Sequence, residues 1–133
     1  MEISAIIKNA FNLNSITVVT NNQSKSISIS SKENGFGSSV NGGELLALSL
    51  AVCYCNDIYR EAAKRNLNIA KVEVEVTSEF AGEGEAGTNF RYKPIIESAA
   101  SPEQIQQLIQ HTDTVAEIHN TLRRGVTVKL NSD

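Results

Sequence analysis

The chain of 133 residues contains no tryptophan, and aromatic residues make up only 5% of it. It also has no excess of positive charge, because 12 Lys and Arg residues stand against 15 Asp and Glu residues, a net charge of -3. A nucleic-acid surface normally shows a basic face or stacking aromatic side chains. The composition therefore argues against nucleic acid as a partner.

Long hydrophobic runs are missing as well. The apolar part of ELLALSLAVCYC, residues 44–55, is the most hydrophobic stretch. It is roughly ten residues long, about half of what a membrane span needs. The N-terminus shows no basic region leading into an apolar run and a cleavage site. We therefore expect a cytoplasmic protein without a membrane partner.

Cysteine is scarce, with Cys53 and Cys55 the only two. On a helix, side chains two positions apart point about 200° away from each other, so these two cannot easily form a disulfide within it. A reducing compartment fits this usage. The two cysteines together with His111 and His119 do not make a tetrahedral metal set. We expect neither a metal nor another cofactor.

The chain does have one long helical stretch, residues 41–66. Asn41 can act as its N-cap, and Glu44, three positions later, can return a hydrogen bond to the Asn41 backbone N–H. Apolar residues cover every face from Leu45 to Tyr54, whereas the second half alternates charged and apolar residues at helical spacing. A helix that is apolar all round is hard to cover in a small domain. We therefore expect a second subunit, and so a homodimer.

Alternation and capping signals predict the other elements. Strands are expected over residues 1–7, 15–20, 24–30, 67–80, 89–97 and 126–130. A second helix should begin at Ser101-Pro102, with a buried stripe of Ile105, Leu108, Ile109 and Val115. A break is expected around residues 116–121. The order β-β-β-α-β-β-α-β describes a single α+β domain over residues 1–133.

Three segments together, ELLALSLAVCYC, KVEVEV and NTLRRGVTV, resemble the OsmC/Ohr family of thiol-dependent peroxidases. The resemblance covers nearly the whole chain. It implies an intertwined homodimer in which two antiparallel sheets wrap around long central helices. It also implies reduction of organic hydroperoxides, in the response to oxidative stress, by a redox cysteine that falls on Cys53. The thiolate of such a cysteine becomes a sulfenic acid.

The sequence departs from the family pattern at three places. Gly43 stands where the resemblance implies a catalytic glutamate, with Glu44 one residue away, and Ala116 stands where it implies a second cysteine. No arginine precedes Arg60, although the resemblance implies one near the N-terminus that keeps the thiol ionised. An active protein would therefore use one cysteine, with the sulfenic acid of Cys53 reduced by an external thiol.

Other side chains are candidates for the same site. Glu117 and His119 fall near the matched position of the second cysteine, so either could replace the missing ionising partner. Cys55 could act together with a cysteine of the partner subunit. The alternatives are that Cys53 and Cys55 serve as small core hydrophobes and that the polar cluster around residues 111–124 is a solvated helix end.

A second function, from a different class, also follows from the departures. Because the reactions of such sites need their groups as a unit, the joint loss of the matched Glu, Arg and second Cys favours a catalytically silent or repurposed dimer. Such a dimer would bind a small hydrophobic ligand in an apolar interface pocket. A plain structural dimer is the third alternative.

Overall fold

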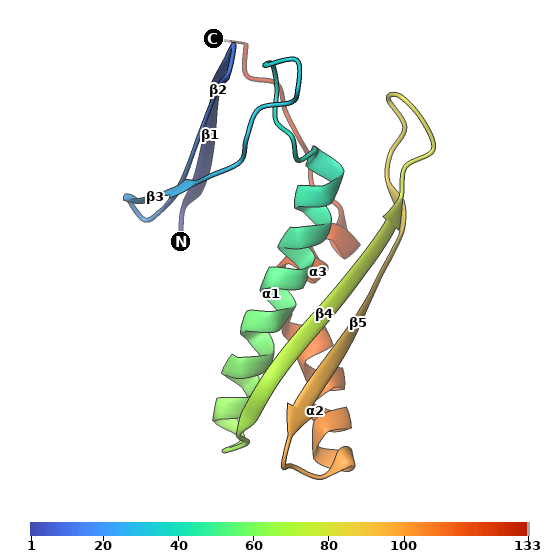
Figure 1. The fold of residues 1–133 in the computed structure, drawn as a ribbon. Coiled ribbons are helices and arrows are strands. Elements are labelled where there is room, and N and C mark those ends of the chain that lie inside the picture. The colour runs from blue at the N-terminus through green and yellow to red at the C-terminus, as the bar shows by residue number, and fades with distance from the viewer. Residues whose placement is uncertain (133) are drawn as a thin grey trace. The chain divides into compact units, whose positions relative to one another are not determined.

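The computed structural model describes residues 1–132 (Figure 1). The chain divides into two compact units, Met1–Leu45 and the part from Leu46 onward, and each unit is described by itself. The elements, in chain order, are β1 (Ile3–Ala10), β2 (Leu13–Thr20), β3 (Gln23–Ile27), α1 (Gly42–Lys64), β4 (Ile69–Glu79), β5 (Thr88–Ser98), α2 (Pro102–Val115) and α3 (Glu117–Arg124).

The first unit is an antiparallel sheet with the strand order β1-β2-β3. The turn between β2 and β3 consists of Asn21 and Asn22, both with positive φ, which asparagine tolerates better than most residues. The strands predicted over residues 15–20 and 24–30 thus pair as a hairpin, with Thr20 opposite Gln23 at its end, although β3 stops at Ile27. In the loop that follows β3, the backbone of Gly37 exchanges two hydrogen bonds of 3.0 Å with the side chain of Asn9 on β1. These bonds tie the loop to the sheet.

Helix α1 begins where the sequence predicts. The Asn41 side chain accepts a hydrogen bond of 2.8 Å from the Glu44 N–H, and the Glu44 carboxylate accepts one of 3.1 Å from the Asn41 N–H. These reciprocal bonds satisfy two backbone donors that would otherwise lack partners at the helix start. The predicted capping box is therefore confirmed.

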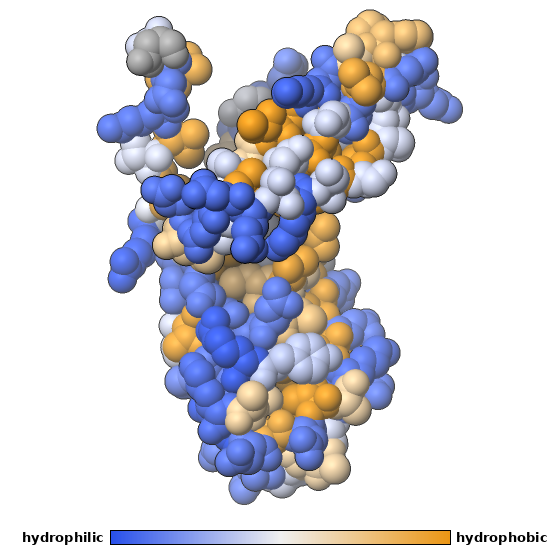
Figure 2. All heavy atoms as spheres, turned by 90° about the vertical axis from the view of Figure 1, so that its left-hand side faces the viewer, coloured by the Kyte–Doolittle hydropathy of each residue, from blue (hydrophilic) through white to orange (hydrophobic). Residues whose placement is uncertain are grey.

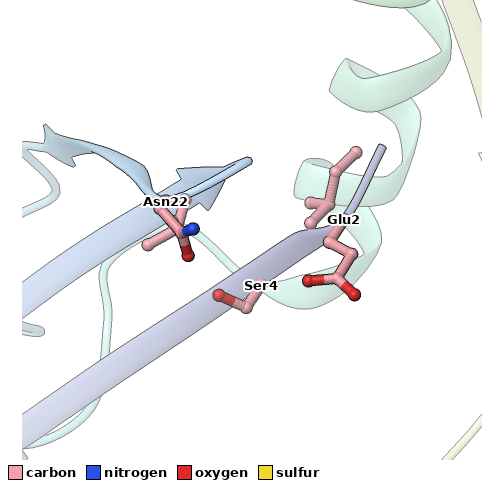
Figure 3. A pocket seen from close by; sticks show the side chains of 5 residues that line it. Glu2, Ser4 and Asn22 are labelled. Carbon is pink, nitrogen blue, oxygen red and sulfur yellow. The ribbon is translucent and has the colours of Figure 1, made fainter.

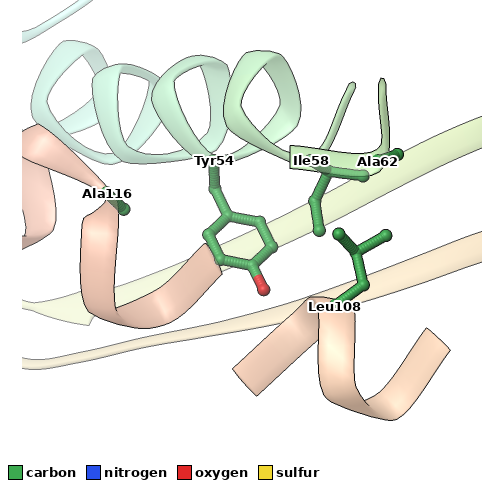
Figure 4. Packing of buried hydrophobic residues seen from close by; sticks show 5 residues of the cluster. All are labelled: Tyr54, Ile58, Ala62, Leu108 and Ala116. Carbon is green, nitrogen blue, oxygen red and sulfur yellow. The ribbon is translucent and has the colours of Figure 1, made fainter. Parts of the chain in front are cut away.

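In the second unit, an antiparallel β4–β5 hairpin packs one face on helices α1 and α2. Along β4, Val72, Val74 and Val76 are half-buried while the residues between them are exposed, as the alternation predicts. The core cluster joins α1, α2 and the α2–α3 junction, and Figure 4 shows its members Tyr54, Ile58, Ala62, Leu108 and Ala116.

The start of α2 is also confirmed. Ser101 and Gln104 form a capping box with bonds of 3.0 and 3.2 Å, and Pro102 occupies the first turn. Of the predicted stripe, Leu108 is fully buried, and the three others are half-buried. The mixed architecture of helices and two antiparallel sheets is the predicted α+β class.

Two predictions near the C-terminus are wrong. The expected break at residues 116–121 is mostly helix α3, with Glu117 in its first turn and Arg123 and Arg124 in its last, where their charges complement the helix dipole. The expected strand at residues 126–130 is not a strand, and Val128 is 90% exposed. Its alternating pattern is local, but a strand forms only where a neighbour supplies hydrogen bonds.

The second half of α1 carries charged and apolar residues at helical spacing, but two of the charged residues are not exposed. Asp57 and Glu61 are buried. Each carboxylate is ion-paired with Arg60, and such pairing offsets much of the cost of removing a charge from water.

Large apolar side chains reach the surface in both units, and Figure 2 shows such side chains among polar ones on one face. On α1 within the second unit, the exposed apolar residues are Leu48, Val52 and Tyr59. Their spacing places them on one stripe of the helix. None of the helices within residues 1–132 combines the length and the apolarity that a membrane span requires.

Candidate thiol site

Cys53 lies in the middle of α1, half-buried and not in a disulfide. At 3.6 residues per turn, the side chains four and seven positions further on share its face of the helix. These positions hold Asp57 and Arg60. The helix therefore brings a thiol, a carboxylate and a guanidinium into one line.

The second half of the site comes from the start of α3. Ala116 is fully buried at the junction of α2 and α3, and the extended backbone there makes it both the C-cap of α2 and the N-cap of α3. The next residue, Glu117, thereby faces α1 across 64 positions of sequence. The start of α3 therefore places the Glu117 carboxylate near Cys53.

Short distances join the four side chains. The Cys53 thiol donates to Asp57 Oδ2 at 3.5 Å, and its sulfur lies 3.9 Å from Glu117 Oε2. One nitrogen of Arg60, Nη1, lies 2.9 Å from Asp57 Oδ1 and 2.9 Å from Glu117 Oε1. In each carboxylate, one oxygen is therefore paired with Arg60 and the other is directed toward the sulfur.

The surroundings of Cys53 favour the protonated thiol. Burial raises the pKa of Cys53, and the charges of Asp57 and Glu117 raise it further. The backbone N–H of Ile118 at the start of α3 acts in the opposite direction but does not outweigh them. Glu117 thus lies where an ionising partner was expected, while its charge opposes ionisation.

The two carboxyl groups beside the sulfur shift in opposite directions. Burial and the adjacent Glu117 raise the pKa of Asp57, while Arg60 opposes the rise. A hydrogen bond from its own backbone N–H, followed by those from Asp57 and Arg60, lowers the pKa of Glu117. Two carboxylates in contact cannot both ionise easily, so the pair holds a proton more readily on Asp57.

Arg60 connects this site to a second ionic cluster around Glu61. The buried carboxylate of Glu61 accepts from Lys64 at 2.9 Å and from Arg60 at 3.0 Å, and the side chains of Arg65 and His111 lie within 3.9 and 3.3 Å. The hydrogen bonds from Lys64 and Arg60 lower the pKa of Glu61 to about 2. The cluster therefore holds Arg60 from a second side.

A clamp between α2 and α3 holds the junction in place. Arg123 donates to the backbone carbonyl of Asp113 at 2.9 Å and to its carboxylate, which also accepts from the Tyr92 hydroxyl. Burial raises the pKa of Asp113, but the bonds from Tyr92 and Arg123 outweigh it and keep the pKa below its usual value. His111 and Asp113 have different partners, as their spacing on a helix predicts.

His119, two positions after Glu117, lies in an aromatic environment. Its ring packs against those of Tyr54 and Tyr92, with centroids 5.7 and 4.6 Å away. Neither ring nitrogen has a hydrogen-bond partner within residues 1–132. Burial and the charge of Arg123 lower the pKa of His119, so the ring is neutral near pH 7.

The remaining candidates have other surroundings. Glu44 serves the capping box of α1. Cys55 borders a shallow cavity of about 260 Å³ together with Ala51, Val52, Asn56 and Val74. It shares the helix stripe of the exposed apolar residues, because it lies seven positions after Leu48.

Sequence reasoning missed Asp57 and Arg60 as members of the site. The signal that could have identified them was their helical spacing from Cys53. A possible metal-binding set was missed as well. Cys53, Asp57 and Glu117 each place one possible ligand atom within 4.8 Å of the others, and such a set could hold a metal ion. Glu117 belongs to a different helix, so no local pattern indicates this set.

Two further cavities bear on the choice of site. One, of about 110 Å³, has mostly apolar walls that include Leu50, Phe90, Tyr92 and Leu122, with His119 and Arg123 also in its lining. Another, of about 350 Å³, lies in the first unit beside Glu2, Ser4 and Asn22 (Figure 3). This second cavity is open, and Glu2, Ser4 and Asn22 in its lining are exposed, so we place no chemistry there.

Comparison with known proteins decides the family. The model for the family described as OsmC-like protein matches residues 35–131. The chain belongs to the OsmC-like family. A comparison with curated proteins gives no match.

Solved structures of OsmC-like proteins have the same fold. An OsmC-like protein from Mycoplasma pneumoniae is 20% identical, with a TM-score of 0.64 over 92% of this chain and 86% of that chain. A Vibrio cholerae protein assigned to organic hydroperoxide resistance, with captopril bound in one active site, is 21% identical, with a TM-score of 0.59 over 92% and 85%. The organic hydroperoxide resistance protein OhrB of Bacillus subtilis is 14% identical, with a TM-score of 0.54 over 90% and 89%.

Proposed function

We propose that this OsmC-like protein reduces organic hydroperoxides through Cys53, with an external thiol as the reductant. The observation that carries the proposal is a base within reach of the thiol, because Cys53 donates to Asp57 Oδ2 at 3.5 Å. Asp57 is in turn held by Arg60 at 2.9 Å. A nucleophile, a base and a group that orients the base form the arrangement that activates weak nucleophiles.

The raised pKa of Cys53 defines how the thiol is used. The resting thiol is protonated, so its proton must leave as the sulfur attacks, and Asp57 is the nearer of the two carboxylates that can accept it. The raised pKa of Asp57 makes that carboxylate a stronger base near neutral pH. Proton transfer to Asp57 during the attack therefore replaces the prior ionisation of the cysteine that other thiol enzymes use.

The reaction balances with one peroxide and two external thiols. The sulfur attacks the terminal peroxide oxygen, the O–O bond breaks, and the leaving alkoxide is protonated, which gives an alcohol and a sulfenic acid on Cys53. One external thiol condenses with the sulfenic acid and releases water. A second thiol then attacks the mixed disulfide, which frees Cys53 and a disulfide of the two reductants.

The protein is proposed to act as a homodimer. Leu48, Val52 and Tyr59 form an exposed apolar stripe on α1, and a contiguous apolar patch on a protein surface commonly marks an interface. Cys55 lies on the same stripe, so pairing with its counterpart across a two-fold axis is the proposed role for this second cysteine.

A second candidate function is the binding of a small hydrophobic ligand without catalysis. It is favoured by the raised pKa of Cys53 together with the cavity of about 110 Å³ lined by Leu50, Phe90, Tyr92 and Leu122. Cumyl alcohol, an unreactive relative of a hydroperoxide, should then raise the melting temperature. Leu122→Trp, which puts a larger side chain in the lining of this cavity, should remove that increase. An equal increase in both proteins would contradict ligand binding in this cavity.

Mass spectrometry with a sulfenic-acid trap tests the peroxidase. Wild type, Cys53→Ser and Cys55→Ser are exposed briefly to cumene hydroperoxide and, separately, to hydrogen peroxide. We expect rapid trapping on Cys53, faster with the organic peroxide, in wild type and in Cys55→Ser. Trapping no faster than that of a free thiol would contradict the proposal.

A further inference from the structure

Three possible metal-ligand atoms, one sulfur and two carboxylate oxygens, converge at the start of α3. Cys53 Sγ, Asp57 Oδ2 and Glu117 Oε2 belong to two helices, and the sulfur lies 3.5 and 3.9 Å from the two oxygens. Around a tetrahedral zinc ion with ordinary bond lengths, a sulfur and an oxygen ligand are about 3.6 Å apart. The separations already match two edges of such a tetrahedron.

Arg60 leaves these three atoms free to bind a metal and fixes the orientation of both carboxylates. It binds Asp57 and Glu117 through the oxygens that face away from the sulfur, Oδ1 and Oε1, each at 2.9 Å. Metal-binding carboxylates commonly have such an outer partner, which fixes their orientation. With Cys53 as thiolate, the three ligands and Arg60 carry a net charge of -2, which one divalent cation neutralises.

Asp57 gives an independent reason to expect a cation. Its side chain is 93% buried, with 7% exposed, yet within residues 1–132 the hydrogen bond made to Oδ2 comes from the thiol of Cys53. A thiol is a weak donor, and buried carboxylate oxygens are normally matched by stronger donors or by a metal. The side chain of Glu117 is 63% exposed, so an ion can enter from solvent on that side.

We propose that Cys53, Asp57 and Glu117 bind a borderline divalent cation of the Zn²⁺ class, with the fourth position open to water. A thiolate ligand selects against Mg²⁺ and Ca²⁺, while the two carboxylates suit Zn²⁺. Binding replaces the thiol proton by the ion and releases that proton to solvent. The inference goes beyond the proposed peroxidase and does not depend on it, and a bound ion would shield the Cys53 sulfur from peroxide.

Cobalt and zinc titrations test the site directly. Co²⁺ should produce a thiolate-to-cobalt charge-transfer band in wild type and Cys55→Ser, and no band in Cys53→Ser. The Zn²⁺ affinity, measured against a chromogenic chelator, should fall at least about tenfold in Glu117→Gln, as even loss of an outer partner causes such a fall. Glu103→Gln, a change at an exposed carboxylate on α2, should bind Zn²⁺ as wild type does.

The outcomes separate this inference from the peroxidase. Equal Zn²⁺ affinity in wild type and Cys53→Ser, or a cobalt band that persists in Cys53→Ser, would overturn the metal site. Glu117→Gln keeps the test independent of folding, since its side chain is exposed and circular dichroism verifies the fold. Sulfenic-acid trapping on chelator-treated protein measures the peroxidase in the absence of metal, so either property can fail without the other.

Discussion

The carboxylate of Glu117 lies 3.9 Å from the sulfur of Cys53, on a different helix and 64 positions along the chain. Its charge raises the pKa of the thiol, and Arg60 is bound to the carboxylate instead of to the sulfur. In this protein, the arginine therefore acts on the thiol through carboxylates. The resting Cys53 is therefore a protonated thiol and not a permanently ionised thiolate.

The substitution Glu117→Gln should make Cys53 more acidic. It removes a negative charge that raises the pKa of Cys53, so the thiolate fraction at a given pH should increase. The measurement is the rate of iodoacetamide alkylation between about pH 7 and pH 10, which spans ordinary thiol titration. The profile of the variant should shift to lower pH in a Cys55→Ser background with a chelator present.

Arg60→Gln is the matched control for that experiment. It releases both carboxylates from their cation, so the Cys53 profile should move in the other direction, to higher pH. Identical profiles for wild type and both variants would show that these charges do not reach the sulfur.

Glu61 should stabilise the fold in a pH-dependent way. Its pKa is lowered from 4.5 to about 2, so its contribution is fully present above pH 4.5 and is lost as the pH falls toward 2. Glu61→Gln should therefore lower the free energy of unfolding at pH 7, and its difference from wild type should shrink below pH 4.5. Urea unfolding over this range, with Glu103→Gln as control, measures the effect, and a constant difference would contradict it.

Leu108→Ala should be among the more damaging core substitutions. Leu108 is fully buried against Tyr54 and Ile58. Truncation leaves a cavity, and such changes lower the free energy of unfolding by about 2 to 5 kcal/mol. Chemical denaturation measures it, with Leu130→Ala at a 97% exposed position expected to change stability by no more than about 0.5 kcal/mol.

Val52→Asp should separate the proposed dimer. Val52 is 48% exposed in the centre of the apolar stripe on α1, and a charge buried without a partner at an interface is strongly unfavourable. Sedimentation velocity should show a dimer for wild type and a monomer for the variant. A wild type that sediments as a monomer at all concentrations would contradict the homodimer, whereas Lys71→Asp, on the exposed face of β4, should leave it intact.

Local sequence signals predicted the elements that depend on neighbours in the chain. Asn41 with Glu44 and Ser101 with Gln104 mark two helix starts, and the alternating valines of β4 identify its buried face. The same kind of signal failed at residues 126–130, because alternation does not reveal whether a strand has a partner.

The thiol site was only partly visible in the sequence, for a related reason. Cys53 follows from the family resemblance, and its spacing to Asp57 and Arg60 is local, yet the burial of Asp57 depends on packing from other elements. The approach of Glu117 depends on the fold of α2 and α3 together. Charge patterns along one helix predict a solvated face unless the partner across the core is known.

The clamp from Arg123 to Asp113 makes the position of the Glu117 side chain depend on the number of residues between α2 and α3. Both ends of the turn from α2 into α3 are fixed, and Glu117 lies within it. Inserting or deleting one residue before Glu117 would rotate its side chain by about 100° around the helix axis. The number of residues between Asp113 and Glu117 is therefore as strict a requirement of this site as the Glu117 carboxylate itself.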